Sequence, residues 1–193
     1  LRALRVAGLQ PAQNLLVLGS GIAGLLMIHA ARALGAGKIL AVDPSPFRRE
    51  MAREFGADEA VSPEEDQISC LRLLTGRRLA DLVFVCTAAE KAHYQALEAA
   101  ERGGKILFFA LPDPKIKIAF SVTDIFGRNG RTLTSSYGAG PYDSWAALEL
   151  MRSLKIRVKD MITHRLPLSE TAKGFQLVEA AQESMKVIIL PNK

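Results

Sequence analysis

The sequence predicts an α/β fold, a doubly wound parallel sheet of about six strands with helices on both faces. Short apolar runs alternate with helical stretches, a spacing typical of parallel strands joined by crossover helices. Hydrophobic residues make up 49% of the 193 residues and aromatic residues only 6%. A chain of this length and composition can bury one core of Val, Ile, Leu and Ala, which suits a parallel sheet covered by helices.

Six apolar runs have the length and composition of buried strands. The first follows the helix-breaking Pro11 and is wholly apolar, the second ends at Asp43, and the fifth ends before Pro112. The expected strands cover residues 15–18, 38–42, 59–61, 80–86, 105–111 and 131–136.

Helices are expected between these runs, because Gly and Pro mark their boundaries. Gly35 and Gly37 close the first helix, and Pro44 and Pro46 introduce the second, which Gly56 ends. The expected helices cover residues 22–34, 44–55, 67–74, 90–101, 122–126 and 142–154. Beyond them we expect an extended segment at 161–166, a helix capped by Ser169 that runs to residue 182, and a last strand at 186–190.

Charge and cysteine content exclude several classes of protein. The formal net charge of +5 is spread among acidic residues, so it predicts no nucleic-acid surface. Cys70 and Cys86 lie in separate elements without metal-ligand spacing, and we expect reduced thiols in a cytoplasmic protein. No apolar run has membrane-spanning length and no signal peptide opens the chain, so we expect no membrane partner.

The sharpest motif is Gly19-Ser20-Gly21-Ile22-Ala23-Gly24, which has the spacing G-x-G-x-x-G. It lies directly after an expected strand and directly before an expected helix. Gly19 lets the chain turn tightly, and Gly21 lets the backbone approach a pyrophosphate. Gly24 lets the helix pack close to the strand. The helix start points free N–H groups at the phosphates. We therefore expect a Rossmann fold that binds a dinucleotide through these six residues.

An acid at the end of the second strand strengthens this interpretation. Asp43 follows Gly24 by 19 residues, where a carboxylate accepts hydrogen bonds from the adenosine ribose. The extra phosphate of NADP would face this carboxylate, so the sequence favours NAD over NADP. Arg48 and Arg49 leave NADP open as the alternative cofactor, since arginines in this loop can hold its extra phosphate. Arg48 can equally lie along the ribose.

Other chemistries fit the sequence less well. A methyltransferase also uses a glycine-rich loop and an acid, but its loop usually lacks the third glycine. There is no G-x-S-x-G nucleophile motif, and Lys91 precedes Tyr94, the reverse of Y-x-x-x-K. His29, His93 and His164 are scattered and show no zinc-ligand spacing. We therefore nominate no catalytic residue and expect no zinc site within this chain.

A series of motifs resembles a known family. They are Leu18 to Leu25, Leu34-Gly35-Ala36, Val42-Asp43, Phe55-Gly56-Ala57-Asp58, Gly103-Gly104 and Ile162-Thr163-His164-Arg165-Leu166-Pro167-Leu168. In this order they resemble the zinc-dependent alcohol dehydrogenases of the medium-chain dehydrogenase/reductase superfamily, including its sorbitol and threonine dehydrogenase branches. The resemblance covers essentially the whole chain, and its last segment is more specific than the glycine motif.

The resemblance implies a role for each matching residue. The glycine motif would carry the pyrophosphate, and Asp43 the adenosine ribose with Arg48 beside it. The adenosine half would lie against Cys86 and Thr87, and Lys186 would approach the pyrophosphate. The residues implied near the nicotinamide carboxamide are Phe109, Ala110, Leu111, Ser135, Ser136, Tyr137 and Gly138. Ala110 departs from the pattern, since the family commonly has glycine there.

The implied function is that of an NAD(H)-binding domain in a dehydrogenase that moves a hydride between an alcohol CH–OH and NAD. In the family, zinc is held mainly by an N-terminal GroES-like catalytic domain, which this sequence lacks. We expect residues 1–14 to be the end of a helix leading in from that domain, and residues 15–193 to be the NAD(P)-binding domain with a C-terminal helix and strand.

Three further expectations follow from the resemblance. A small alcohol or polyol is the expected substrate of the full-length protein, and the fragment alone is expected to be inactive. A homodimer is expected through the edge strand between Arg131 and Ser136. The alternative is a free-standing NAD(H) sensor or regulatory module without catalysis.

Overall fold

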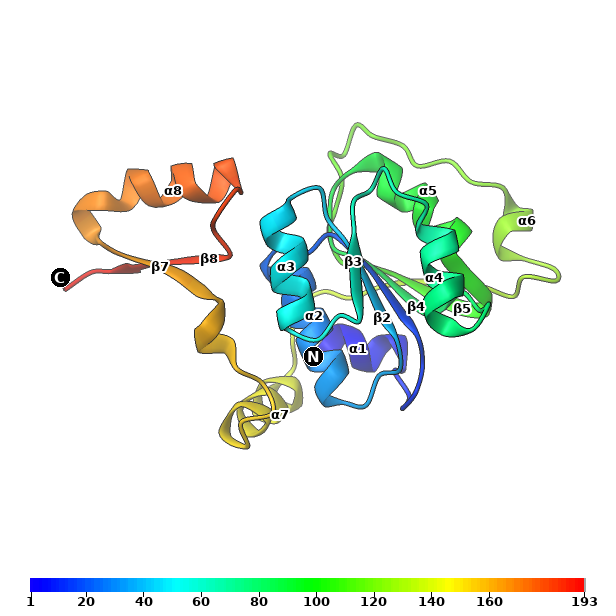
Figure 1. Ribbon diagram of the computed structural model, residues 1–193, viewed down its shortest axis with the longest axis horizontal. Helices are drawn as coiled ribbons and strands as arrows, with labels where there is room; N and C mark the ends of the chain where they lie inside the picture. The colour runs from blue at the N-terminus through cyan, green and yellow to red at the C-terminus, as the bar shows by residue number, and fades with distance from the viewer. Residues whose placement is uncertain (193) are drawn as a thin grey trace.

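The computed structural model describes residues 1–192. At its centre lies a six-stranded parallel sheet with the strand order β3-β2-β1-β4-β5-β6 (Figure 1). The strands are β1 (Leu15–Leu18), β2 (Ile39–Val42), β3 (Glu59–Val61), β4 (Ala80–Val85), β5 (Ala100–Phe108) and β6 (Thr132–Ser135). Because the strand order reverses between β1 and β4, a crevice opens at the carboxyl ends of these two strands.

Helices cover both faces of the sheet. One face carries α1 (Arg2–Ala7), α2 (Ile22–Ala33) and α3 (Pro46–Glu54). The other carries α4 (Gln67–Thr75) and α5 (Glu90–Ala99). The connection from β5 to β6 contains α6 (Val122–Ile125), and α7 (Pro141–Arg152) follows β6. The predicted fold class is confirmed. None of the helices within residues 1–192 has the length and hydropathy that a bilayer-spanning segment requires.

The apolar strands divide their side chains between two cores. Leu15 and Val17 of β1 belong to the core beneath α1, α2 and α3, whereas Leu16 and Leu18 belong to the core beneath α4 and α5. Successive side chains of a strand point to opposite faces. A continuous apolar run is therefore what a strand covered on both sides requires, and the predicted positions of these strands follow from it.

The fifth strand begins earlier than the sequence predicts. We expected a helix to residue 101 and a strand from residue 105, but α5 ends at Ala99 and β5 begins at Ala100. Ala100 pairs with Ala80, and the register with β4 then shifts before Leu82. Gly103 has a left-handed φ of 72°, which lets the strand bend at this irregular point. The glycine pair bends a strand instead of ending a helix.

The C-terminal residues form a separate unit. β7 (Ile162–Pro167) and β8 (Lys186–Leu190) pair in a two-stranded parallel sheet, with α8 (Thr171–Ala180) between them. Figure 1 shows this unit, in orange and red, beside the main sheet and not within it. The predicted Ser169 cap is wrong, because Ser169 lies in the short helix η2 (Leu168–Glu170) and no side chain caps α8. The helix also ends at Ala180, short of residue 182.

The short helix η1 (Val158–Met161) connects the main domain to this C-terminal unit. His29 of α2 holds the start of this connection in place. Its Nδ1 lies 3.1 Å from the Phe55 carbonyl oxygen, and its Nε2 accepts the Arg157 amide at 2.9 Å. A ring that donates at one nitrogen and accepts at the other is neutral. Burial, assisted by the charge of Arg157, lowers the pKa of His29, although the Phe55 carbonyl and Asp160 act in the opposite direction.

We expect His29 to make the stability of the chain pH-dependent. Because its folded pKa is lowered, its contribution is complete above the unfolded pKa of about 6.5 and is lost as the pH falls through the window below that value. The loss should approach one hydrogen bond, about 1 kcal/mol. Urea unfolding from about pH 8 to pH 5 measures it. His29→Leu should flatten this slope, whereas His164→Gln should preserve it; equal slopes in all three proteins would contradict the assignment.

Candidate dinucleotide-binding site

The glycine motif forms a tight loop between β1 and α2. Gly19 has a φ of +92°, and a Cβ there would lie 2.9 Å from the Cβ of Thr87. At Gly24, a Cβ would lie 1.8 Å from the Gly19 carbonyl oxygen. Gly21 is different: the nearest atom to a Cβ there is Nη1 of Arg48, at 3.9 Å. Two glycines are therefore required by the fold, while the middle one leaves an open approach to the backbone.

Asp43 ties the end of β2 to this loop. The carboxylate is buried, with the residue 3% exposed. Its Oδ2 accepts the Ser20 amide at 2.8 Å and its Oδ1 accepts the Ser45 amide at 2.9 Å. Each carboxylate oxygen has a second lone pair, so the group can hold the loop and still accept a further hydrogen bond. Asp43 thus positions the glycine motif and lines the crevice.

The two arginines that follow Asp43 have different surroundings. Arg49 Nη1 donates to the carbonyl oxygens of Asp43 at 2.8 Å and Pro44 at 2.9 Å. Arg48 lines the crevice, and its buried Nε has no hydrogen-bond partner within residues 1–192. A buried donor without a partner is costly and indicates an acceptor supplied by a ligand. Arg49 is engaged by the backbone, whereas Arg48 is available.

The first cavity of the crevice has a volume of about 310 Å³ and lies over the ends of β1, β2 and β4. Its lining combines the predicted residues Gly19, Gly21, Asp43, Arg48, Cys86 and Thr87 with Pro63, Glu64, Lys91 and Gln95. Burial raises the pKa of the Cys86 thiol to about 12. This thiol therefore stays protonated at neutral pH and serves as an apolar wall, not as a nucleophile.

The outer wall of this cavity was not predicted from the sequence. The Pro63 carbonyl oxygen accepts from Lys91 Nζ at 3.3 Å and Gln95 Nε2 at 3.2 Å, both from α5. Gln67 Nε2 approaches the same oxygen at 3.4 Å. These contacts hold the loop after β3 against α5. Lys91 and Gln95 are distant from Pro63 in sequence, and no local motif joins them to it, so no sequence signal reveals these contacts.

A second cavity, of about 550 Å³, lies on the other side of the glycine loop. Ile22 and Ala23 line it from the start of α2, Phe109 from the end of β5, and Lys186 from the start of β8. Val158 and Met161 close it from η1, and Ile162 from the start of β7. Both cavities have volumes typical of ligand sites. The loop therefore separates two compartments, with the amino end of α2 between them.

The remaining predicted residues have other positions. Ser20 is fully buried and its hydroxyl has no partner within residues 1–192. Gly24 is buried beneath the loop. Six residues at or after the ends of β5 and β6 line neither cavity: Ala110, Leu111, Ser135, Ser136, Tyr137 and Gly138. Leu111 is 84% exposed and Tyr137 96% exposed, so the structure does not bring these two into contact with the loop.

The histidines and cysteines do not converge. Within residues 1–192, no three His, Cys, Asp or Glu side chains lie where they would together hold a metal ion. His29 is engaged with the Arg157 amide, and His93 stacks on Phe108 with its ring 5.5 Å away. The donor set of the described residues therefore does not fit a zinc ion.

Comparisons with known proteins agree with this geometry. The family described as "Zinc-binding dehydrogenase" matches residues 23–153, more than half of the chain. L-threonine 3-dehydrogenase of Bacillus licheniformis is 31% identical over 188 residues, which are 96% of this chain and 54% of that protein. L-threonine 3-dehydrogenase of Bacillus subtilis is 33% identical, over 91% of this chain and 50% of that protein.

A solved structure shows the same arrangement. Alcohol dehydrogenase TADH from Thermus sp. ATN1 superimposes with a TM-score of 0.86 at 28% identity, covering 97% of this chain and 55% of that one. The chain thus spans about half the length of the relatives it matches. The family match extends from the glycine loop through α7, across the elements that build the crevice. The chain belongs to the zinc-binding dehydrogenase family.

Proposed function

We propose that this chain is the NAD(H)-binding domain of a zinc-type medium-chain alcohol or polyol dehydrogenase. The observation that carries the proposal is the glycine loop at the amino end of α2, with a cavity on each side of it. A dinucleotide consists of two nucleoside halves joined by a pyrophosphate. Two compartments separated by a helix start match this division, because the helix start binds phosphates.

The residues present fit such a cofactor. Gly21 leaves room for the pyrophosphate beside its backbone, and the buried Nε of Arg48 lacks an acceptor within residues 1–192. Asp43 would receive the adenosine ribose, and Cys86 and Thr87 would line the adenosine half. Phe109 would line the nicotinamide half, and Lys186, in the lining of the same cavity, would approach the pyrophosphate. When bound, the cofactor supplies the nicotinamide carbon that exchanges a hydride with the substrate.

We propose NAD in preference to NADP. Asp43 is an acceptor with no proton to donate when ionised, so it suits ribose hydroxyls and repels a phosphate. Arg49, the second candidate for binding that phosphate, is engaged by the carbonyl oxygens of Asp43 and Pro44. Of the two arginines that follow Asp43, only Arg48 is available, and one arginine beside a buried carboxylate makes a poor phosphate site.

The rest of the catalytic apparatus would lie outside this chain. The described residues do not fit a zinc ion, and we propose that a small alcohol or polyol reacts in the full-length protein only.

We also propose a cytoplasmic location, since Cys70 and Cys86 are free thiols, as is typical of a reducing compartment.

Titration of the purified chain with NADH and with NADPH tests this function. We expect saturable NADH binding at least about tenfold tighter than NADPH binding, since a charge clash of about 1.4 kcal/mol is enough for that factor. Mixing the chain with NAD and simple alcohols or polyols should give no steady turnover. Tighter NADPH binding would overturn the cofactor preference, and steady turnover would overturn the proposed inactivity. Failure to bind either cofactor would reject the assignment for this chain.

We also propose a homodimer through β6. The two edges of the main sheet differ: at β3, the Ala60 amide donates to Glu59 Oε1 at 2.8 Å, and its carbonyl oxygen accepts from Arg53 Nη2 at 2.6 Å. At β6, no side chain within residues 1–192 bonds to the backbone of the strand. An open edge favours pairing with another strand.

Light scattering should show a dimer, and Thr134→Pro should weaken it. A monomer at all concentrations would reject the proposed homodimer.

A further inference from the structure

Helix α7 is held to the body by an ion pair at its amino end and by Leu150, which packs against the main core. Its only buried side chain is Asp143, which accepts from Arg5 Nε at 2.9 Å and from the Gly140 amide at 2.9 Å. Arg5 and the Gly140 amide lower the pKa of Asp143 to about 2. The carboxylate is therefore ionised at any physiological pH, and this ion pair fixes the amino end of α7 above α1.

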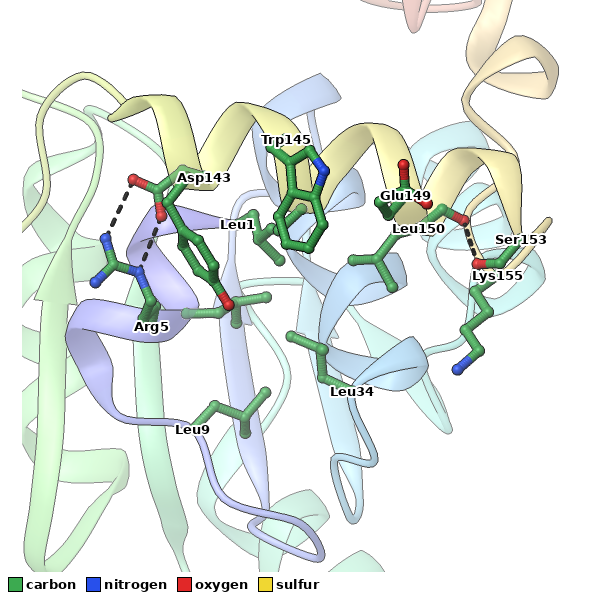
Figure 2. Close-up of a pocket in the computed structure, with 13 residues that line it drawn as sticks. Leu1, Arg5, Leu9, Leu34, Asp143, Trp145, Glu149, Leu150, Ser153 and Lys155 are labelled. Atoms are coloured by element: carbon green, nitrogen blue, oxygen red, sulfur yellow. Dashed lines mark hydrogen bonds and ion pairs between the residues drawn. The ribbon is translucent and has the colours of Figure 1, made fainter.

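The apolar side of α7 faces a cavity. Figure 2 shows it between α7, α1 and the end of α2, with Leu34, Leu9 and Leu150 around it and Trp145 above. Its volume is about 520 Å³, within the range of small-molecule sites. Trp145 is 57% exposed and Leu34 39% exposed. Large apolar side chains thus surround a space that no described residue fills.

Several polar groups of this cavity are engaged within residues 1–192. Arg5 binds Asp143, Glu149 accepts from Arg152 at 3.1 Å, and the Ser153 hydroxyl donates to the Leu150 carbonyl at 3.2 Å. Lys155 lies at the end of the cavity nearest Ser153 in Figure 2. Its ammonium makes no hydrogen bond or ion pair within residues 1–192. The cavity therefore presents an apolar body with the unpaired ammonium of Lys155 at one end.

We propose that this cavity binds an amphipathic carboxylate, with its hydrocarbon chain along the leucines and Trp145 and its carboxylate at Lys155. The apolar lining favours hydrocarbon over water, and the free ammonium favours an anionic head over a neutral one. The cavity shares no residue with the adenosine-side cavity and only Leu1 with the second cavity. The site is thus distinct from the ribose and pyrophosphate contacts of the proposed cofactor, and its test does not depend on them.

Trp145 is the only tryptophan of the chain, so its fluorescence reports on this site directly. The probe is decanoate, kept below its micelle concentration. We expect a saturable change in emission, and octanoate should bind about tenfold more weakly because two methylene groups are removed. Lys155→Met should weaken decanoate about tenfold but leave binding of the neutral 1-decanol unchanged.

Two variants on α7 locate the site. Ala146 lines the cavity, so Ala146→Phe should abolish decanoate binding, whereas Leu148→Phe is the matched control because Leu148 is exposed and lies outside the lining. Thermal unfolding by circular dichroism verifies that each variant is folded. Emission that changes linearly without saturation, equal binding by Lys155→Met, or unimpaired binding by a folded Ala146→Phe would each overturn the proposal.

Discussion

Gly24→Ala is expected to destabilise the fold by about 3 kcal/mol or more. The added Cβ would lie 1.8 Å from the carbonyl oxygen of Gly19 and 2.9 Å from its carbonyl carbon. Both atoms belong to the backbone of a loop that Asp43 holds in place, so neither can move aside cheaply. In an unconstrained helix the same substitution would stabilise by up to about 1 kcal/mol. The sign of the change therefore tests the close packing of α2 against β1.

Gly21→Ala provides the matched comparison within the same loop. Gly21 has a φ of −64°, which alanine adopts readily, and its nearest neighbour is 3.9 Å from the added Cβ. We expect unchanged stability but NADH binding at least about tenfold weaker, because the methyl group would occupy the approach of the pyrophosphate. Urea unfolding and NADH titration of both variants measure the two effects. A Gly24→Ala protein as stable as the parent would refute the packing argument.

Asp43→Asn is expected to affect both stability and cofactor choice. The carboxylate accepts the Ser20 and Ser45 amides on different oxygens. An asparagine side chain has one oxygen and one NH₂ group. The backbone amide of either Ser20 or Ser45 would therefore face the NH₂ donor instead of an acceptor, which should lower the free energy of unfolding by about 1–3 kcal/mol. The ribose would also lose a charged acceptor. NADH affinity should fall about tenfold or more, and the preference for NADH over NADPH should shrink with it.

A control separates this effect from the loss of charge alone. Asp113 also accepts a backbone amide, that of Lys115 at 2.8 Å, but in an exposed loop outside both cavities. Asp113→Asn should therefore change neither unfolding free energy nor cofactor affinity beyond about 0.5 kcal/mol. If Asp43→Asn kept the parent's ratio of NADH to NADPH affinity, the ribose role of Asp43 would be rejected.

Local sequence features predict much of this fold for physical reasons. A strand covered on both faces must be apolar at every position, and β1, β2 and β4 meet that requirement in full or nearly so. The glycine motif is likewise constrained by backbone geometry, which the residue type reveals directly. Gly103 shows the limit of such reasoning. A left-handed glycine suits both the end of a helix and a bend in a strand, and the pairing of Ala100 with Ala80 decides between them.

The site is predicted less completely than the fold, because its walls come from distant elements. Asp43 follows from the strand and its spacing, but its bonds to Ser20 and Ser45 depend on how β1 and β2 are placed. The Pro63 loop and the joint containing Met161 line the cavities through tertiary contacts alone. No periodicity or motif encodes those positions. Residue type therefore identifies the centre of the crevice, and only the fold identifies its boundaries.

The unequal edges of the main sheet have a consequence for assembly in crowded solution. Glu59 and Arg53 bind the amide and the carbonyl oxygen of Ala60 in β3, so an incoming strand would have to displace this salt bridge before it could pair with Ala60. If β6 pairs with a second copy, as we propose, only that side of the sheet would accept another chain. The proposed assembly would then stop at a pair, because a second open edge would be needed for strands to add edge to edge into a fibril.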